Sequence, residues 1–333
     1  MNKEFPTVSI IIPCYNEIQF IQKCLDSLIK NDYPKEKIEI LIYDGGSNDG
    51  TLEILKKFQK KYTLIKIFHN PYRHQVKALN MGIKKAKGEI IIRCDAHSEY
   101  PPNYISEIVK YLLKGEAANV GGVYDACPSK DTCIAKAIAF ALKHPFGVGF
   151  SSRFPGQAKP KFADTVPFGA WKKKIFEEVG LFDERFIRAQ DLEHNVRLKK
   201  YGKKILLLPF LRVKYYARPT LRELISMAYQ YGYSQVVVLR KHKILVSYRK
   251  IFPPMFVCGS FFLWIEKVRF LYFLYVLLGV LFGTEIALKE KRICFLFLMP
   301  IVFFILHFFY GIGFLKALID WLIFKFPLTY PHP

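Results

Sequence analysis

The stretch VSIIIPCYNE, residues 8–17, decides the fold. Its first six residues form an apolar run of strand length, and the polar residues Tyr15, Asn16 and Glu17 follow soon after. The next segment, residues 20–30, carries apolar side chains at helical spacing. The sequence therefore predicts a strand that ends in polar residues and leads into a helix.

The same alternation continues along the first hundred residues. Further apolar runs occur at 38–44, 64–70 and 89–95, with amphipathic helical patterns at 51–62 and 76–88. Uninterrupted apolar strands between helices predict an α/β fold with a mainly parallel sheet covered on both faces. Ligands of such sheets bind beyond the carboxyl ends of the strands, so we expect the polar residues there to share one rim.

The charge balance indicates anionic partners. The 333 residues carry a net charge of +22, and a basic cluster at 239–250 precedes the apolar C-terminal part. This cluster fits the anionic cytoplasmic face of a membrane. Because no nucleic-acid-binding motif accompanies the charge, we do not expect a nucleic acid partner.

The cysteines indicate a reducing compartment. There are seven, an odd number, and none has CxxC spacing, so we expect neither a disulfide nor a zinc site. The N-terminal apolar run is short and unlike a signal peptide.

The C-terminal part predicts a membrane region. Segments 268–288 and 293–315 are long enough to cross a bilayer, whereas 251–265 is marginal and contains two prolines. The basic loop at 289–292 favours three crossings if it is cytoplasmic, and two crossings are the alternative. We expect a catalytic domain over 1–230, an amphipathic basic linker over 231–252 and a membrane region over 253–333. This arrangement predicts a multi-pass cell-membrane protein with its catalytic domain on the cytoplasmic side.

Three polar clusters are candidates for chemistry, and each has a structural alternative. In DGGSNDGT, residues 44–51, an acid ends a strand, yet Ser47 or Asp49 would equally cap a helix. Asp95 and His97 have the spacing of two that points side chains the same way, so they could share a divalent metal, or serve as a cap and a surface residue. Asp191 begins a helical pattern, where acids are favoured without any catalytic role. Taken together, acids at several strand ends in a basic chain favour an enzyme acting on an anionic substrate at a membrane.

These motifs resemble a known family. VSIIIPCYNE, DGGSNDGT, ALNMGIKKAKGEIIIRCDAH and FDERFIRAQDLEHNVRLKKYG occur in the order and spacing of family 2 glycosyltransferases, which are inverting enzymes with the GT-A fold. DAHSEYPPNYI and HFFYGIGFL are more similar to the membrane-anchored branch that contains succinoglycan-type enzymes. The catalytic resemblance covers roughly residues 6–210.

The resemblance implies a role for each matched residue. The nucleotide pocket would be lined by Pro13, Tyr15, Asn16, Glu17 and Asp44, with Lys77 and Asn80 near the ribose and phosphates. Asp95 and His97 would hold Mg²⁺ or Mn²⁺ against the donor diphosphate, Asp95 thereby also contacting the donor. Asp191 would be the general base.

The chain departs from the family pattern at three positions. The second aspartate of the metal motif is His97, which leaves the metal open and favours Mn²⁺. Gln190 replaces the glutamate before the base, which removes a negative neighbour of Asp191. Gly45 replaces an acid of the nucleotide motif.

The resemblance predicts transfer of a sugar, with inversion, from a nucleotide-sugar donor to a lipid-linked or polysaccharide acceptor, in polysaccharide biosynthesis. Two other classes stay open. A sugar nucleotidyltransferase would share the sheet and the acids, and a non-enzymatic membrane adaptor would explain the apolar C-terminal part.

Overall fold

The computed structural model describes residues 5–148, 159–245 and 247–323, and the chain divides into two compact units. The sheet unit comprises Met1–Asp125 and Ser152–Tyr215. The helical unit comprises Ala126–Ser151 and Tyr216–Pro333. The catalytic, linker and membrane ranges expected from the sequence stay a prediction.

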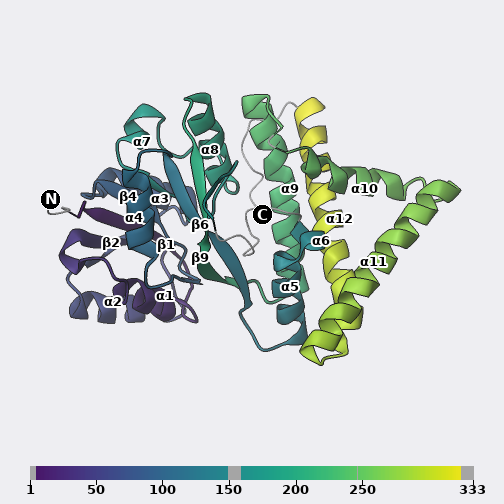
Figure 1. Cartoon of the computed structure of the whole chain (residues 1–333), viewed down its shortest axis with the longest axis horizontal. Helices are drawn as coiled ribbons and strands as arrows, with labels where there is room; N and C mark the ends of the chain where they lie inside the picture. The colour runs from purple at the N-terminus through teal and green to yellow at the C-terminus, as the bar shows by residue number, and fades with distance from the viewer. Residues whose placement is uncertain (1–4, 149–158, 246, 324–333) are drawn as a thin grey trace. The chain divides into compact units, whose positions relative to one another are not determined.

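The sheet of this unit (Figure 1) has parallel pairs among its first strands and antiparallel pairs among the later ones. Its strands in the described residues are β1 (Val8–Cys14), β2 (Ile38–Asp44), β3 (Ile65–His69), β4 (Ile90–Arg93), β5 (Ser98–Glu99), β6 (Asn119–Pro128), β7 (Lys161–Phe162), β8 (Ala170–Lys172) and β9 (Ile205–Ala217). Their order is β3-β2-β1-β4-β8-β6-β9-β5, with β7 paired to β9. The parallel pairs are β1 with β2, β1 with β4, and β2 with β3. The sheet is thus mixed, and its parallel half consists of the four strands that the sequence predicted.

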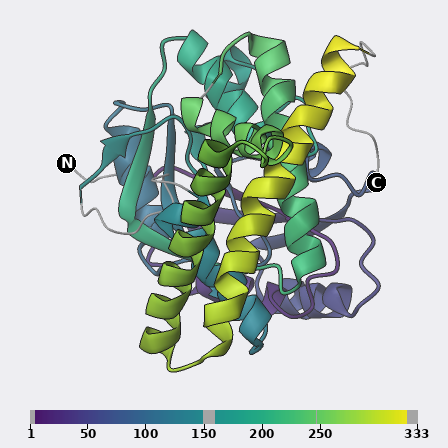
Figure 2. The same cartoon turned by 90° about the vertical axis from the view of Figure 1, so that its right-hand side faces the viewer.

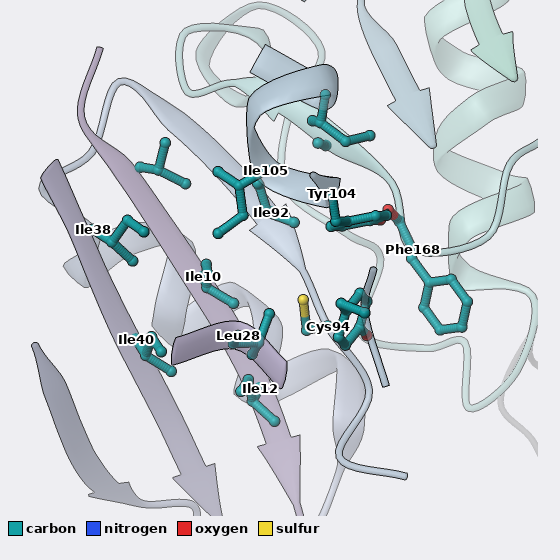
Figure 3. Packing of buried hydrophobic residues seen from close by; sticks show 14 of the residues in the cluster. Ile10, Ile12, Leu28, Ile38, Ile40, Ile92, Cys94, Tyr104, Ile105 and Phe168 are labelled. Atoms are coloured by element: carbon teal, nitrogen blue, oxygen red, sulfur yellow. The ribbon is translucent and has the colours of Figure 1, made fainter. Parts of the chain in front are cut away.

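Helices cover both faces of the sheet because its strands are apolar on both sides. The helices of this unit are α1 (Ile21–Ile29), η1 (Lys35–Lys37), α2 (Thr51–Lys61), α3 (Gln75–Lys85), α4 (Tyr104–Leu113), α7 (Ile175–Glu178) and α8 (Gln190–Lys200). On one face Ile10, Ile12 and Ile92 pack with Leu28 of α1 and Ile105 of α4 (Figure 3). On the other face the intervening residues pack against α3, α7 and α8. Burying one such isoleucine contributes about 1.5–3 kcal/mol, so this packing holds the strand ends in register.

The helical unit is built around one long helix. It contains α5 (Cys133–Lys143), α6 (Pro145–Val148), α9 (Leu221–His242), η2 (Tyr248–Ile251), α10 (Phe252–Ser260), α11 (Glu266–Glu290) and α12 (Cys294–Leu322). α12 has 29 residues and packs against α5, α9, α10 and α11. Gly232 of α9 lies against the carbonyl of Tyr310, and Gly313 of α12 lies against that of Tyr229. Glycine is needed at these points because a Cβ would collide with backbone of the facing helix.

Two helices of this unit, α11 and α12, are long and apolar enough to cross a membrane in the part of the chain that is described. They pack against each other near the turn that joins them (Figure 1 and Figure 2), where Gly279 and Gly283 of α11 face Pro300, Phe295 and Met299 of α12. Small residues four apart allow such close approach between helices in lipid. α10 has nine residues, fewer than a helix needs to cross a bilayer, and the choice between two and three crossings stays a prediction.

One disulfide corrects the expectation of none. Cys133 at the start of α5 is bonded to Cys294 at the start of α12. The two cysteines are 161 residues apart in the chain, so no local spacing could reveal the pair. Cys14, Cys24 and Cys94 are buried and take no part in this bond.

Candidate active site

The loops after β1 and β2 are joined by hydrogen bonds. Cys14 and Asp44 are partners in the parallel register, so both loops begin at the same edge. The amide of Asn16 donates to Ser47 Oγ (2.9 Å), and its side-chain oxygen accepts from the amide of Asn48 (3.0 Å). The amide of Glu17 donates to Thr51 Oγ1 (2.9 Å). The segment after the first strand is therefore fixed to the loop after the second.

The acids of the second loop hold the loop itself. Asp44 is buried, and its carboxylate accepts from the amides of Gly46 (2.9 Å) and Ser47 (3.0 Å). Asp49 accepts from the amide (3.0 Å) and the hydroxyl of Thr51 (2.6 Å). Burial raises the pKa of Asp49, but hydrogen bonds from Thr51 and Ile18 outweigh it and leave the pKa below its ordinary value. Asp49 thus binds the first residue of α2, next to the expected cap position, whereas Asp44 holds its own loop, and a nucleotide contact of Asp44 stays a prediction.

A basic and aromatic group lies beside this loop. Arg73, which follows β3, donates from Nε to the carbonyl of Gly45 (3.1 Å), and its guanidinium lies 5.4 Å from the ring centre of the exposed Tyr15. Lys77 Nζ lies 3.9 Å from the ring centre of Tyr72. The sequence motifs predict Tyr15 and Lys77 as nucleotide-side residues but do not point to Arg73 and Tyr72. Their position after another parallel strand was the signal that would have found them.

Asn80 lies inside the unit rather than at its edge. Its side chain donates to the carbonyl of Phe182 (2.9 Å) and to Glu184 Oε1 (3.0 Å), and it accepts from the amide of Phe182 (3.1 Å). These bonds use the amide group to tie α3 to the segment after α7. Pro13 belongs to β1 itself, opposite Tyr43. Ribose or nucleotide contacts of Asn80 and Pro13 stay predictions.

His97 is hydrogen-bonded to Glu17. His97 Nδ1 and Glu17 Oε1 are 2.9 Å apart, and both side chains are mostly buried. Because a carboxylate only accepts, Nδ1 carries the hydrogen of this bond, and Nε2 is the ring nitrogen left for another partner. This bond joins the loop after β1 to the loop after β4. The loops after β2, β1 and β4 are therefore contiguous along the carboxyl edge of the sheet.

Asp95 and Asp191 meet through a buried arginine. Arg93 Nη2 donates to Asp95 Oδ1 (3.1 Å), and Arg93 Nη1 is 3.9 Å from Asp191 Oδ2. Burial lowers the pKa of Arg93, but Asp95 and Asp191 outweigh this and hold the pKa above its ordinary value. The sequence motifs do not point to Arg93. Its position two residues before Asp95 was the available signal, because side chains two apart on an extended segment point to the same side.

Asp191 is the accessible member of this group. It lies in the first turn of α8, and its side chain is 33% exposed, against 7% for Asp95. Its Oδ1 accepts from the amide of Leu192 (2.8 Å), and the preceding Gln190 bonds Gln75 of α3 (3.3 Å). By contrast Glu193 is fully buried against Arg197, which also donates to the carbonyls of Val179 and Leu181. Asp191 is thus oriented but open, whereas Glu193 and Arg197 anchor the helix.

A divalent cation would have two protein ligands here. Within the residues described, no group of three or more His, Cys, Asp or Glu side chains is arranged to hold a metal. The Glu17 partner on Nδ1 is nevertheless the arrangement that orients a metal-ligating histidine. One carboxylate and one imidazole suit Mn²⁺ and leave positions for diphosphate oxygens and water. The donor set therefore fits a metal that is bound together with an anionic ligand.

Known proteins match this chain over much of its length. Residues 9–180 match the model of the family Glycosyl transferase family 2. The chain is 34% identical over 321 residues to a Methanococcus voltae protein, the dolichyl N-acetyl-alpha-D-glucosaminyl phosphate 3-beta-D-2,3-diacetamido-2,3-dideoxy-beta-D-glucuronosyltransferase, covering 94% of this chain and 97% of that one. It is 30% identical to the succinoglycan biosynthesis protein ExoA of Rhizobium meliloti, over 73% of each chain.

Solved structures share the fold. A mannosyltransferase from Pyrobaculum calidifontis, in complex with GDP-Man and Mn²⁺, matches with a TM-score of 0.59 and 18% identity, covering 96% of this chain and 88% of that one. GalNAc-T7 with UDP, GalNAc and Mn²⁺ matches with a TM-score of 0.54 and 21% identity, covering 72% of this chain and 48% of that one. These neighbours confirm the expected GT-A-type fold.

Proposed function

Because this chain belongs to glycosyl transferase family 2, as its motifs indicated, we propose that it transfers a sugar from a nucleotide-diphosphate donor to a lipid-linked acceptor. The observation that carries this proposal is the linked set at the carboxyl edge of the sheet, in which Arg93 joins Asp95 to Asp191 and Glu17 joins His97 to the first loop. Membership in a glycosyltransferase family argues against the sugar nucleotidyltransferase and the non-enzymatic adaptor.

Asp191 is the general base in this proposal. Its carboxylate is partly exposed, accepts a hydrogen bond from the Leu192 amide, and lies in the first turn of α8. From this position it accepts the proton of the acceptor hydroxyl as that oxygen attacks the anomeric carbon. Attack from the face opposite the diphosphate inverts the configuration without an enzyme nucleophile.

Asp95 and His97 would hold the divalent cation, with Glu17 fixing the imidazole. When bound, the cation supplies positive charge that stabilises the departing diphosphate. Arg73 and Lys77, beside the Asp44 loop, add fixed positive charge near the nucleotide end. Tyr15 and Asp44 are the proposed contacts of the nucleoside.

A lipid-linked acceptor follows from two features. The relative that covers nearly the whole chain is named for a dolichyl phosphate-linked substrate. In addition, α11 exposes apolar side chains around most of its circumference, as helices in lipid do. We propose that α11 and α12 anchor the enzyme in the cell membrane, with its catalytic unit on the cytoplasmic side, where nucleotide sugars are supplied.

The test is a transfer assay with the full chain in membranes. A panel of nucleotide sugars that includes uronic acid donors is offered with dolichyl- and polyprenyl-phosphate-linked N-acetylglucosamine, with and without Mn²⁺. We expect Mn²⁺-dependent transfer that falls about 10²–10⁴-fold in Asp191→Asn, the usual contribution of a positioned base.

Asp164→Asn is the matched control, because Asp164 is an exposed aspartate paired with Lys199 on the surface of the same unit. It should transfer at the wild-type rate. Equal rates for wild type and Asp191→Asn would refute the assignment of the base, and equal rates for wild type and Asp95→Ala would refute the metal site.

A further inference from the structure

The direction of the Arg93 side chain follows from the alternation of β4. Ile92 and Cys94 belong to the core on the side of α1 and α4. Ile91 belongs to the opposite core, which includes Leu198 of α8. Arg93 continues the side of Ile91, because successive strand residues point to opposite faces. The positively charged guanidinium of Arg93 therefore lies beneath the first turn of α8, on a side of β4 that is apolar at Ile91.

The guanidinium divides its nitrogens between two carboxylates. Nε and Nη2 donate to Asp95 Oδ1 (3.3 and 3.1 Å), whereas Nη1 faces Asp191 Oδ2 (3.9 Å). Only 8% of the Arg93 side chain is exposed, so water screens these interactions little. A lysine has a single nitrogen, so it cannot place separate nitrogens against the two acids as the planar guanidinium does.

We infer that Arg93 is a positioning residue that holds Asp191 for the reaction and also competes with a divalent cation for Asp95. The inference rests on the proposed function. In the absence of donor, the charge of Asp95 is already satisfied by Arg93, which leaves His97 as the remaining strong ligand for a cation. A donor diphosphate adds oxygens and negative charge, and the cation then binds firmly. The cation site is thus conditional on the donor.

The test measures Mn²⁺ binding directly, by electron paramagnetic resonance of free Mn²⁺ over the purified full chain in detergent without nucleotide. Arg93→Gln removes the charge but keeps a side chain that donates to Asp95. We expect it to bind Mn²⁺ at least about fivefold more tightly than wild type. Arg93→Lys keeps the competing charge, so its Mn²⁺ affinity should stay within about twofold of wild type.

Turnover should change in the opposite direction. With the donor found in the panel, Arg93→Gln is expected to lose about 100-fold in kcat with less than about threefold change in donor KM, because Asp191 is no longer held. Arg93→Lys should also lose at least about tenfold in kcat. A variant that is merely misfolded would lose both binding and turnover, so tighter Mn²⁺ binding with slower turnover separates the inference from a structural defect.

Asp95→Asn distinguishes failure of the inference about Arg93 from failure of the proposed metal site. If Asp95→Asn weakens Mn²⁺ binding while Arg93→Gln does not strengthen it, the inference about Arg93 is overturned and the proposed metal site stands. If neither Asp95→Asn nor His97→Asn alters Mn²⁺ binding, the metal site itself falls and the inference falls with it. Wild-type kcat in Arg93→Lys would overturn the positioning role.

Discussion

Replacing Glu17 by methionine should weaken the use of Mn²⁺ without weakening donor recognition to the same degree. Methionine matches the length of glutamate but cannot accept the hydrogen bond from His97 Nδ1, which is 2.9 Å long. Loss of such an outer partner of a metal-ligating histidine typically costs 10–100-fold. The Glu17 and His97 side chains are 18% and 21% exposed, so water can partly replace the lost acceptor. We therefore expect about 10–30-fold, which corresponds to about 1.4–2 kcal/mol.

The assay compares Mn²⁺ activation of transfer in wild type, Glu17→Met and Glu17→Gln. The glutamine side chain still accepts through its oxygen, so its loss should stay below about fivefold. Glu36→Met is the control, because Glu36 is exposed in η1. The reasoning is refuted if Glu17→Met raises the donor KM while the Mn²⁺ concentration for half-maximal activity is unchanged. That result would return Glu17 to the nucleotide pocket, where the family resemblance placed it.

Three further predictions concern stability, each measured by unfolding of the purified chain. Ile10→Ala removes a fully buried side chain and should cost about 2–5 kcal/mol, whereas a cost below about 1 kcal/mol would contradict the packing between β1 and α1. Gly232→Val should destabilise the helical unit by about 1–3 kcal/mol, because the new side chain meets the Tyr310 carbonyl; Ser226→Ala on the exposed side of α9 is the control, and an equally stable valine variant would disprove the close contact. Asp49 has a lowered pKa in the folded chain, so its stabilising effect is full above the ordinary aspartate pKa of 3.8 and is lost as pH falls through the lower folded value. The difference in unfolding free energy between wild type and Asp49→Ala should therefore shrink over that acidic range, and a difference that grows there would contradict the lowered pKa.

The parallel half of the sheet was predictable because its signals are local. Each of β1, β2, β3 and β4 is an apolar run within one residue or two of the predicted bounds, and each is followed by a polar segment. The antiparallel half was not predicted. β8 has three residues inside a mixed segment, and its place beside β4 depends on pairing with a strand about 80 residues earlier. Such pairing leaves no periodic pattern in the strand itself.

The sequence predicts candidate site residues but not the contacts between them. The resemblance named Asp95, His97 and Asp191, and the structure shows Asp95 and Asp191 linked through Arg93. The link could have been suspected from the alternation along β4, but its other end depends on how α8 packs on the sheet. The Glu17 to His97 bond likewise depends on β1 and β4 being neighbours, which the chain order does not state.

The length of α12 exceeds the thickness of the hydrocarbon layer of a bilayer. A helix of 29 residues is about 43 Å long, whereas the hydrocarbon layer is about 30 Å thick. The surplus of about 13 Å lies naturally at the C-terminal end, where Lys316 and Asp320 occur and Tyr233 of α9 donates to Asp320 (3.1 Å). An α12 that crosses the bilayer upright would therefore keep its last turns outside the hydrocarbon layer, packed against α9.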